Sequence, residues 1–164
     1  MELAALNRLP EEEAARAFSR CCGASRWARA MTRGRPFADR KALLSGAAAA
    51  WEALGPEDWR EAFSHHPRIG DREALRKRWA GQEQAGVQGA SEEVLRGLEE
   101  GNREYEKRFG HVFLVCATGK SAAEMLSLLR ERLSNPPGPE LKVAAGEAAK
   151  ITRIRLEKLL DEES

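Results

Sequence analysis

The sequence predicts an all-α fold, a single-domain bundle of about six to eight helices that spans residues 1–164. Alanine, leucine, glutamate and arginine dominate the composition while β-branched residues are scarce, and this balance favours helices over strands. Helix-start signals recur along the chain, whereas no stretch alternates apolar and polar residues as a half-buried strand does. A length of 164 residues with 42% hydrophobic residues is enough for one domain with a real core.

Two helices are expected in the first part of the chain. Pro10 is followed by three glutamates, which is typical of a helix start, because proline suits the first helical position and acids stabilise the N-terminal end. This helix should run to about Cys22 and stop at Gly23. A short helix over 25–31 follows, before a loop over 32–37.

The next two helices are separated by a Gly-Pro break. Asp39 can cap the first of them, which runs through an alanine tract to Leu54. Gly55 and Pro56 end that helix, and Pro56 can open the next one. The second helix must end before Pro67, because proline disfavours helical backbone in the residue that precedes it.

The segment 64–90 differs in character, since it holds two of the three histidines and several glycines. A helix over 72–79 is expected between two loops. Ser91 then opens a long helix with charged faces that runs to Phe109 and is ended by Gly110.

The last part of the chain contains one apolar extended stretch and two helices. Residues 111–117 form a short buried segment, which is more readily an extended stretch in a helical protein than a strand. Ser121 and Glu124 make a capping box. The helix that they open places four apolar side chains on one face: Met125, Leu128, Leu129 and Leu133. A rigid turn over 135–139 precedes a last helix over 140–160.

Charge and composition exclude several classes of function. The chain has 27 basic and 26 acidic side chains, a net charge of +1, which gives no general attraction to nucleic acid or to an anionic membrane. No apolar run approaches the roughly 20 residues of a membrane span, and the first ten residues do not resemble a signal peptide. A cytoplasmic protein is expected, without nucleic acid or membrane as a partner.

The three cysteines do not indicate a disulfide framework or a metal centre. Cys21 and Cys22 are adjacent and Cys116 stands alone, so there is no CxxC pair. Buried, reduced thiols are the simple interpretation. A nucleophilic Cys116 would need a base, for which His111 is near in sequence.

His65 and His66 are the first candidates for chemistry. They stand directly before Pro67, in backbone that is extended or turned, so at least one can project into a cleft. Histidine suits proton transfer near neutral pH. The alternative is that both only finish a helix, where His⁺ favours the C-terminal dipole. A metal site of His65, His66 and Asp71 has no recognised spacing to support it.

Two further features are candidates for a polar ligand site. Glu83 lies between two glutamines and between Gly81 and Gly86, so side chain and backbone can both approach a ligand. Taken alone, however, the pattern is better explained by an ordinary solvated loop. In the last helix, Glu147 falls on the apolar stripe formed by Val143, Ile151 and Ile154. A buried charge needs a partner, so an internal salt bridge and a ligand contact are both open for Glu147.

Taken together, the motifs resemble those of the 2-oxo-4-hydroxy-4-carboxy-5-ureidoimidazoline (OHCU) decarboxylase family over nearly the whole chain. Each motif alone is weak, but their order and spacing are specific. The motifs are, in chain order, Leu6-Asn7-Arg8-Leu9, Cys22-Gly23-Ala24-Ser25-Arg26-Trp27, Arg35-Pro36-Phe37, His66-Pro67-Arg68-Ile69-Gly70, Trp79 with Glu83-Gln84-Ala85-Gly86, Phe109-Gly110-His111-Val112-Phe113, Gly119-Lys120, Arg132-Leu133, and Glu147, Ile151, Arg155 and Leu156.

The resemblance implies an all-α homodimer that acts on a small-molecule substrate, a ureidoimidazoline carboxylate, without metal or organic cofactor. It assigns catalysis to His66, which precedes the proline, and to Glu83, and it places Pro67, Gln84 and Arg155 at the substrate, with Arg153 as the alternative if the helix register differs. Backbone groups of one segment should also line the pocket: Val115, Cys116, Ala117, Thr118 and Gly119. The family usually has a serine after the tryptophan, where this chain has Ala80.

The function implied is the cofactor-independent decarboxylation of OHCU to S-allantoin in urate degradation, a carboxy-lyase reaction. The alternative from another class is a helical interaction module that keeps the pocket without the activity, for which Ala80 is a first sign. Retention of His66, Glu83 and Arg155 argues against it. A third hypothesis is decarboxylation of a related ureido compound.

Overall fold

Helices make up most of the computed structural model, which describes residues 1–67, 73–75, 77 and 91–161. Within these ranges every regular element is a helix and none is a strand, so the all-α prediction is confirmed. The chain divides into two compact units, Met1–His65 with Ala145–Ser164, and His66–Ala144. The helix expected over 72–79 lies largely outside the described residues. The four residues of this range that are described, 73–75 and 77, are helical.

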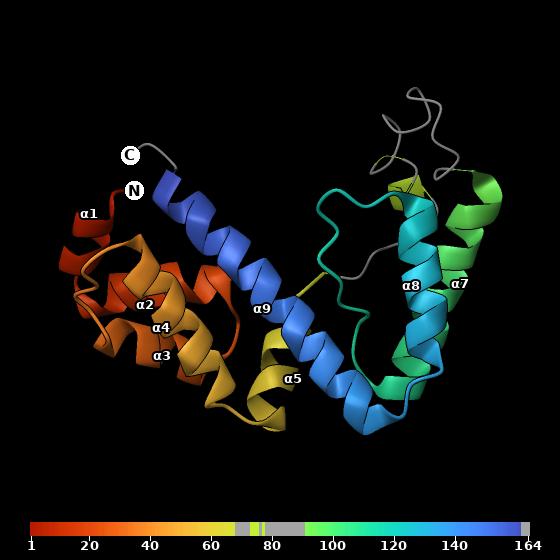
Figure 1. The fold of residues 1–164 in the computed structure, drawn as a ribbon, viewed down its shortest axis with the longest axis horizontal. Coiled ribbons are helices and arrows are strands. Elements are labelled where there is room, and N and C mark those ends of the chain that lie inside the picture. The colour runs from red at the N-terminus through yellow and green to blue at the C-terminus, as the bar shows by residue number, and fades with distance from the viewer. Residues whose placement is uncertain (68–72, 76, 78–90, 162–164) are drawn as a thin grey trace. The chain divides into compact units, whose positions relative to one another are not determined.

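The first unit begins with five short helices that pack around a common core (Figure 1). They are α1 (Leu3–Arg8), α2 (Glu11–Cys21), α3 (Ser25–Arg33), α4 (Arg40–Glu52) and α5 (Pro56–Ser64). The rings of Phe18 and Trp27 meet edge to face with centroids 6.0 Å apart, and both side chains are fully buried. Asp39 caps α4 as predicted, since its carboxylate accepts a hydrogen bond from the Ala42 amide at 2.8 Å.

Residues 6–9 and 35–37, which the resemblance singled out, hold each other in place. The Asn7 side chain donates to the Phe37 carbonyl and accepts from the Phe37 amide, both at 2.9 Å. The guanidinium of Arg35 donates to the carbonyls of Leu6 at 3.0 Å and Leu9 at 2.7 Å. The last carbonyls of a helix have no partner within it, so Arg35 completes the C-terminal end of α1.

The last helix, α9 (Pro137–Asp161), supplies the remaining core of the first unit. The indole N–H of Trp51 donates to the carbonyl of Ala145 at 3.0 Å, a contact that requires a close approach of the two helices. Small side chains permit it, and the buried positions of this part of α9 are Ala145, Ala148, Thr152 and Leu156.

Two predictions for this helix are wrong. Val143, expected on the apolar stripe, is 41% exposed, while Ile151 and Ile154 are only half-buried, because the alanine positions face the core instead. The helix also begins at Pro137 rather than Glu140. Proline is tolerated there, since the amides of a first helical turn have no partner within the helix.

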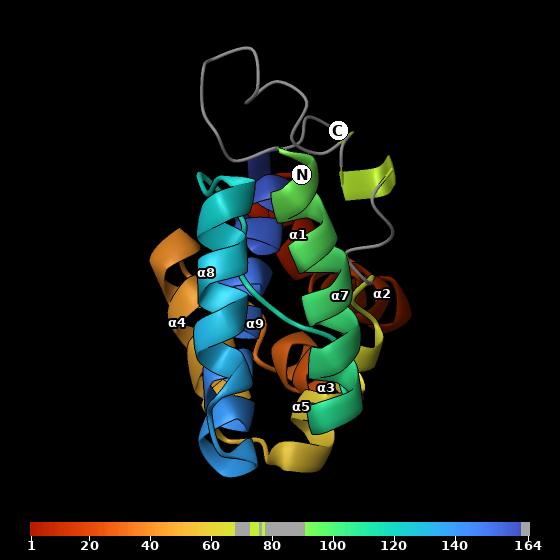
Figure 2. The ribbon, with the colours of Figure 1, turned by 90° about the vertical axis from the view of Figure 1, so that its right-hand side faces the viewer.

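The second unit is built on two helices, α7 (Glu92–Phe109) and α8 (Ala122–Leu133), which lie side by side in Figures 1 and 2. Glycines allow the close packing, since a Cβ on Gly101 would lie 2.6 Å from a methyl group of Leu129. Met125 and Leu129 of the predicted apolar face are fully buried, whereas Leu128 and Leu133 are half-buried.

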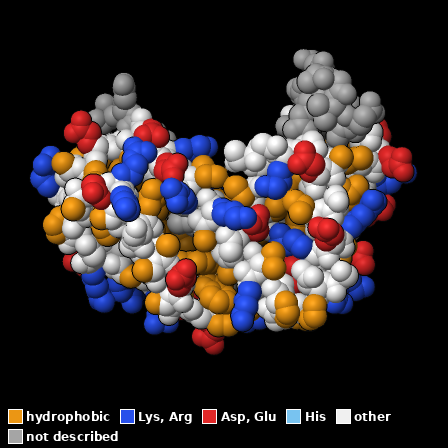
Figure 3. Space-filling model, in the orientation of Figure 1, with side chains coloured by type: hydrophobic (Ala, Val, Ile, Leu, Met, Phe, Trp, Pro, Cys, Tyr) orange, Lys and Arg blue, Asp and Glu red, His pale blue; other side chains and the backbone are white. Residues whose placement is uncertain are grey.

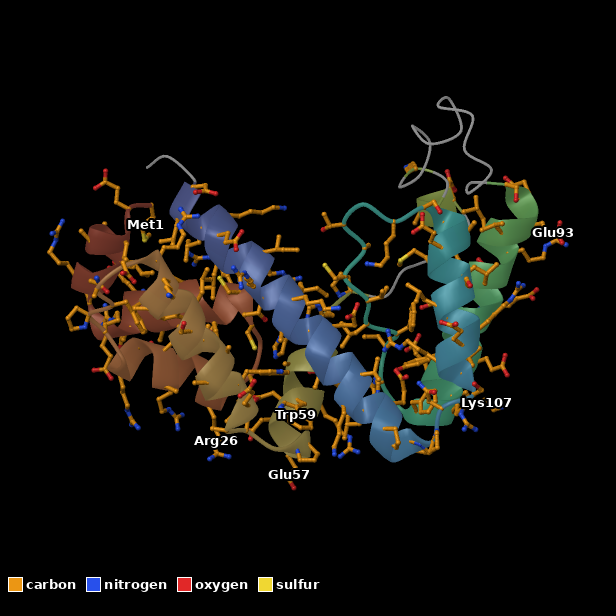
Figure 4. All side chains as sticks on the ribbon, viewed as in Figure 1. Met1, Arg26, Glu57, Trp59, Glu93 and Lys107 are labelled. Atoms are coloured by element: carbon orange, nitrogen blue, oxygen red, sulfur yellow. The ribbon has the colours of Figure 1, made fainter. Side chains whose placement is uncertain are left out.

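The predicted helix-end signals of the second unit are confirmed. The hydroxyl of Ser91 accepts from the Val94 amide, and Gly110 ends α7 with φ 81°. Glu93 and Lys107 lie near the N-terminal and C-terminal ends of α7 (Figure 4), the arrangement that the helix dipole favours. Ser121 caps α8 as predicted, by accepting from the Glu124 amide at 3.1 Å. The Glu124 carboxylate accepts from the Ser121 hydroxyl at 3.2 Å and not from the Ser121 amide, so the full capping box is not formed. Between these helices, residues 111–120 form neither helix nor strand, as expected.

The face of the molecule drawn in Figure 3 carries acidic and basic side chains in close alternation, in keeping with the balanced charge of the chain. Among the described residues, no helix combines the length and the apolar character that a bilayer span requires.

Candidate active site

Helix α5 delivers the two candidate histidines at its C-terminal end. Pro56 is its first residue, and the Asp58 carboxylate accepts from the Gly55 amide, which fixes the helix start. The helix closes at Ser64. The amide of His65 still donates to the carbonyl of Ala62 at 3.1 Å, so His65 is the C-cap residue. His66 and Pro67 follow outside the helix, with His66 half-buried and Pro67 exposed.

The imidazole of His65 packs against the backbone of Gly23. A Cβ built on Gly23 would lie 2.5 Å from Cδ2 of this ring, so no side chain fits at position 23 without moving it. Gly23 is therefore needed for this contact as well as for ending α2. The contact gives His65 a local packing role at the end of α5.

Glu61, which was not singled out from the sequence, ties α5 to the start of α3. Its carboxylate accepts from the Ser25 amide at 2.9 Å and from the Ser25 hydroxyl at 2.7 Å. These two hydrogen bonds lower the pKa of Glu61. Because the first amides of a helix lack partners within it, the carboxylate acts as a cap supplied from another helix. The helix-start position of Ser25 was the only signal in the sequence.

The segment 115–119 ends in a tight turn. The Lys120 amide donates to the Ala117 carbonyl at 3.0 Å, and Gly119 adopts φ 76°, a conformation that favours glycine. The Lys120 ammonium donates to the Cys116 carbonyl at 2.7 Å. Cys116 is buried and Val115 and Ala117 are half-buried, whereas Thr118 and Gly119 are exposed.

Arg153 and Arg155, the two candidate substrate-binding arginines, have different surroundings. Arg153 is exposed, and its Nε donates to the Glu157 carboxylate at 3.0 Å. Arg155 is half-buried and lines a cavity of about 280 Å³ together with the cations Arg20 and Lys158.

Thr152 and Arg155 both act on the thiol of Cys22. Burial raises the pKa of the Cys22 thiol, while hydrogen bonds to Ala24 and Thr152 and the charge of Arg155 act in the opposite direction. A raised pKa keeps this thiol protonated and unreactive, as expected for a buried cysteine.

A salt bridge within the chain was one of the two roles expected for Glu147, and the structure contains it. Lys150, one turn further along α9, donates to its carboxylate at 2.6 Å. The Glu147 side chain is 13% exposed and that of Lys150 64%. Glu147 is thus a charge at the edge of the buried face, neutralised from the solvent side.

A buried ionic cluster in the second unit was missed from the sequence. It consists of Tyr105, Arg132 and Glu140, and the Arg132 guanidinium donates to the Glu140 carboxylate through Nε at 2.9 Å and Nη2 at 2.6 Å. The Tyr105 hydroxyl donates to the same carboxylate, and burial together with this bond raises the pKa of Tyr105. The available signal was spacing, since Arg132 lies three residues after Leu129 and shares its buried face.

The structure describes only part of the predicted site. His66, Pro67 and residues 115–119 belong to the second unit, and Arg155 belongs to the first. Glu83, Gln84 and Ala80 lie outside the described residues. Among the residues that are described, no group of three histidine, cysteine, aspartate or glutamate side chains is placed to hold a metal ion.

Comparison with known proteins gives a consistent result over almost the full length. The family model described as OHCU decarboxylase matches residues 7–157. The crystal structure of an OHCU decarboxylase in the presence of (S)-allantoin superposes with a TM-score of 0.75 at 35% sequence identity, covering 94% of this chain and 100% of that one.

Two curated relatives show how this chain compares in length. The uric acid degradation bifunctional protein TTL of Arabidopsis thaliana is 35% identical over 150 residues, which are 88% of this chain but only 46% of the plant protein. The 2-oxo-4-hydroxy-4-carboxy-5-ureidoimidazoline decarboxylase of Amia calva is 29% identical over 171 residues, covering 98% of this chain and 95% of the fish protein. The chain thus spans about half of the plant relative and nearly all of the fish relative.

Proposed function

The chain belongs to the OHCU decarboxylase family, and from that premise we propose that it converts OHCU to (S)-allantoin as a carboxy-lyase of urate degradation. The observation that carries this proposal is the structural match, over 94% of the chain, to an OHCU decarboxylase crystallised with (S)-allantoin. The Arabidopsis relative, whose name assigns it to uric acid degradation, supports the same substrate class. We propose that residues 1–164 act as one OHCU decarboxylase-like domain.

The proposed reaction needs no electron sink beyond the substrate. OHCU carries a carboxylate and a hydroxyl on C4, next to the C5=N imine. When the bond from C4 to the carboxylate breaks, its electron pair moves toward the imine, and carbon dioxide leaves. The imine nitrogen, which receives that pair, takes up a proton from the medium. The C4 hydroxyl then loses its proton to become the carbonyl, and C5 gains a proton on one face. A protein can assist by orientation, by charge and by moving those protons, so we expect neither a metal nor an organic cofactor.

We assign the acid–base role to His66, near the C4 hydroxyl and the carboxylate. Its position supports this role, because His66 leaves the end of α5 next to the rigid Pro67 while His65 is engaged by Gly23. Glu83 orients the ring through the hydroxyl or the ureido group and shares in proton transfer. Arg155 balances the negative charge of the substrate. Its partly buried position favours it over Arg153, which is exposed and paired with Glu157.

The remaining contacts are proposed to read the polar edges of the substrate. Gln84 faces the ring or the ureido group, and Pro67 borders the ring. Backbone groups of residues 115–119 complete the pocket, and the fixed turn at Gly119 supports a defined presentation of these groups. Ala80 cannot supply the hydroxyl that a serine would, so one hydrogen bond to the substrate is either missing or comes from a backbone amide or from water.

The proposal includes a homodimer in the cytoplasm. The dimer follows from the family resemblance. The buried thiols of Cys21, Cys22 and Cys116 support a reducing compartment, where cysteines are kept reduced.

The proposed function is tested by generating the unstable substrate from urate in situ and following the chirality of allantoin with time. One-handed (S)-allantoin, formed faster than the spontaneous rate, is the expected result. Racemic allantoin at the spontaneous rate would contradict the proposal and favour an interaction module. Acceleration with a related ureido compound but not with OHCU would instead change the substrate assignment.

A further inference from the structure

Among the residues that the structure describes, side chains and not a strand hold the backbone between α7 and α8. The carbonyl of Leu114 accepts from Nη1 of Arg132, and the carbonyl of Cys116 accepts from Nζ of Lys120 at 2.7 Å. Two residues before Leu114, the carbonyl of Val112 lies 3.0 Å from Nδ1 of His111. Three alternate carbonyls of this segment therefore meet polar side chains.

Arg132 reaches Leu114 because the rest of its guanidinium is fixed. Nε and Nη2 are bound by Glu140, which is fully buried, and the guanidinium carbon lies 4.5 Å from the centre of the Phe113 ring. Glu140 is held in turn by the hydroxyl of Tyr105 and by the Asn135 side chain at 3.0 Å. Both carboxylate oxygens of Glu140 are thus engaged, and Nη1 of Arg132 donates to the Leu114 carbonyl.

The buried ion pair of Arg132 and Glu140 is poorly explained by stability alone. A buried ion pair contributes little net stabilisation, because desolvation offsets the attraction between the charges. The cluster does, however, determine where the Leu114 carbonyl lies, and Leu114 directly precedes the residues 115–119. An arginine suits this task, because its rigid fork can bind a carboxylate and a carbonyl at once.

We propose that Arg132 is a positioning residue that sets the backbone of residues 115–119 for substrate binding, with Glu140 holding Arg132 in place. The inference rests on the proposed function, in which this backbone contacts the substrate. Arg132 itself acts only through the Leu114 carbonyl. Lys120, which follows the segment, adds a second hydrogen bond near its start, to the Cys116 carbonyl.

The test compares Arg132→Lys with Tyr105→Phe. Lysine keeps the positive charge beside Glu140, but its single nitrogen cannot occupy the separate positions of Nη1 and Nη2. An ammonium drawn to the carboxylate should therefore leave the Leu114 carbonyl without its donor. Tyr105→Phe removes the hydroxyl that donates to the same carboxylate and accepts from Nη2 of Arg132 at 3.4 Å, but it leaves Nη1 of Arg132 and the Leu114 carbonyl unchanged. Both variants are folded proteins if their far-ultraviolet circular dichroism matches the wild type, and both are assayed well below their unfolding temperatures.

The expected result is a change in binding rather than in the amount of active enzyme. Arg132→Lys should raise KM for OHCU and the dissociation constant for (S)-allantoin by about 10-fold, the effect of one or two weakened hydrogen bonds, with a smaller change in kcat. Hydrogen exchange of peptides covering residues 111–120 should become faster in this variant. Tyr105→Phe should lower the unfolding temperature but keep KM within about twofold.

Three outcomes would overturn the inference. In the first, Arg132→Lys lowers apparent kcat with KM and hydrogen exchange unchanged, which indicates only a loss of folded protein. In the second, both variants raise KM equally, which makes the whole cluster a structural element. In the third, hydrogen exchange changes but (S)-allantoin binding does not. Failure of the proposed function is distinguishable, because the wild type would then neither decarboxylate OHCU nor bind (S)-allantoin.

Discussion

His65 and His66 are neighbours in sequence but have separate surroundings. The ring of His65 covers the backbone of Gly23 at the end of α5, whereas His66 lies beyond the helix, half-buried and followed by Pro67. Adjacent residues in a turn point in different directions, so a pocket that receives one of these rings does not receive the other. This separation makes the pair suitable for a matched comparison.

His66→Ala should remove most of the acceleration of (S)-allantoin formation, by about 10²–10⁴-fold, which is typical for loss of a general acid–base group. The fold should stay intact, because His66 lies outside the helix. His65→Ala is the control. It removes a packing contact and should lower the unfolding temperature while leaving the rate nearly unchanged. Both are measured with the same assay of rate and chirality.

An inactive His65→Ala together with an active His66→Ala would show that the assignment is displaced by one residue. Near-native rates in both variants would place the proton transfer elsewhere. Glu83→Gln tests the second proposed catalytic residue independently of the histidines. It keeps the shape of the side chain while removing its charge, so the proposed mechanism predicts slower formation of (S)-allantoin.

The carboxylate of Glu61 predicts a pH dependence of stability. The folded state lowers the pKa of Glu61 through its hydrogen bonds to the hydroxyl and amide of Ser25. The carboxylate therefore stabilises the fold above the unfolded pKa, about 4.3 for glutamate, and this contribution is lost as the pH falls through the lower, folded pKa. In urea unfolding, Glu61→Gln should be less stable than the wild type at pH 7, and the difference should shrink below pH of about 4.

Glu104→Gln is the control for this experiment, because Glu104 is an exposed glutamate in the middle of α7. Its stability relative to the wild type should change little between neutral and acidic pH. A difference for Glu61→Gln that persists unchanged at acidic pH would show that the substitution acts through packing and not through the charge.

Long-range polar pairs were the least predictable features at this scale. The sequence left a salt bridge open for Glu147, and its partner Lys150 lies one helical turn away, where periodicity can find it. Glu61 pairs with Ser25, 36 residues distant, and Glu140 pairs with Tyr105, 35 residues distant. No local pattern links such residues, because the fold alone brings them together.

At the scale of elements, most helix ends could be predicted because their signals are local. Asp39, Ser91 and Ser121 cap the helices that follow them, and Gly110 ends α7 in the left-handed conformation. The buried face of α9 could not be predicted in the same way. A search for large apolar side chains selects Val143, whereas close approach to Trp51 selects small ones.

The alanine face of α9 predicts a position-dependent effect of added volume. Ala148 is 2% exposed, so Ala148→Leu should overpack the first unit and lower the free energy of unfolding by about 1–3 kcal/mol. Val143→Leu adds volume on the same helix where the side chain is 41% exposed, and it should change stability by less than about 0.5 kcal/mol. Urea unfolding of both variants measures the difference.

A larger loss of unfolding free energy in Val143→Leu than in Ala148→Leu would contradict this assignment. It would support the buried face first expected from the sequence, which includes Val143. Equal small effects would mean that the contact between α9 and Trp51 is loose enough to accept a larger side chain. The indole fluorescence of Trp51 and its neighbours gives a second readout, because a displaced helix changes the environment of a buried tryptophan.

At the scale of the whole molecule, the proposed site draws on residues far apart in sequence. His66, Glu83, the segment 115–119 and Arg155 are separated by tens of residues, and no spacing rule predicts that they act together. The sequence identified them through the order of the family motifs. The family match over residues 7–157 supports the family assignment on which this choice of residues rests. The role of each residue is tested by the His66, His65 and Glu83 variants.

The proposed homodimer is the last prediction, and it concerns the chain as a whole. Most soluble homo-oligomers are twofold dimers, in which the same surface patch serves both subunits. Sedimentation velocity at micromolar concentration should therefore give twice the 18.2 kDa of one chain. Because a dimer is stabilised by mass action, its unfolding temperature should also rise with protein concentration. A species of 18.2 kDa at micromolar concentration, with an unfolding temperature independent of dilution and with full activity, would show that the enzyme works as a monomer.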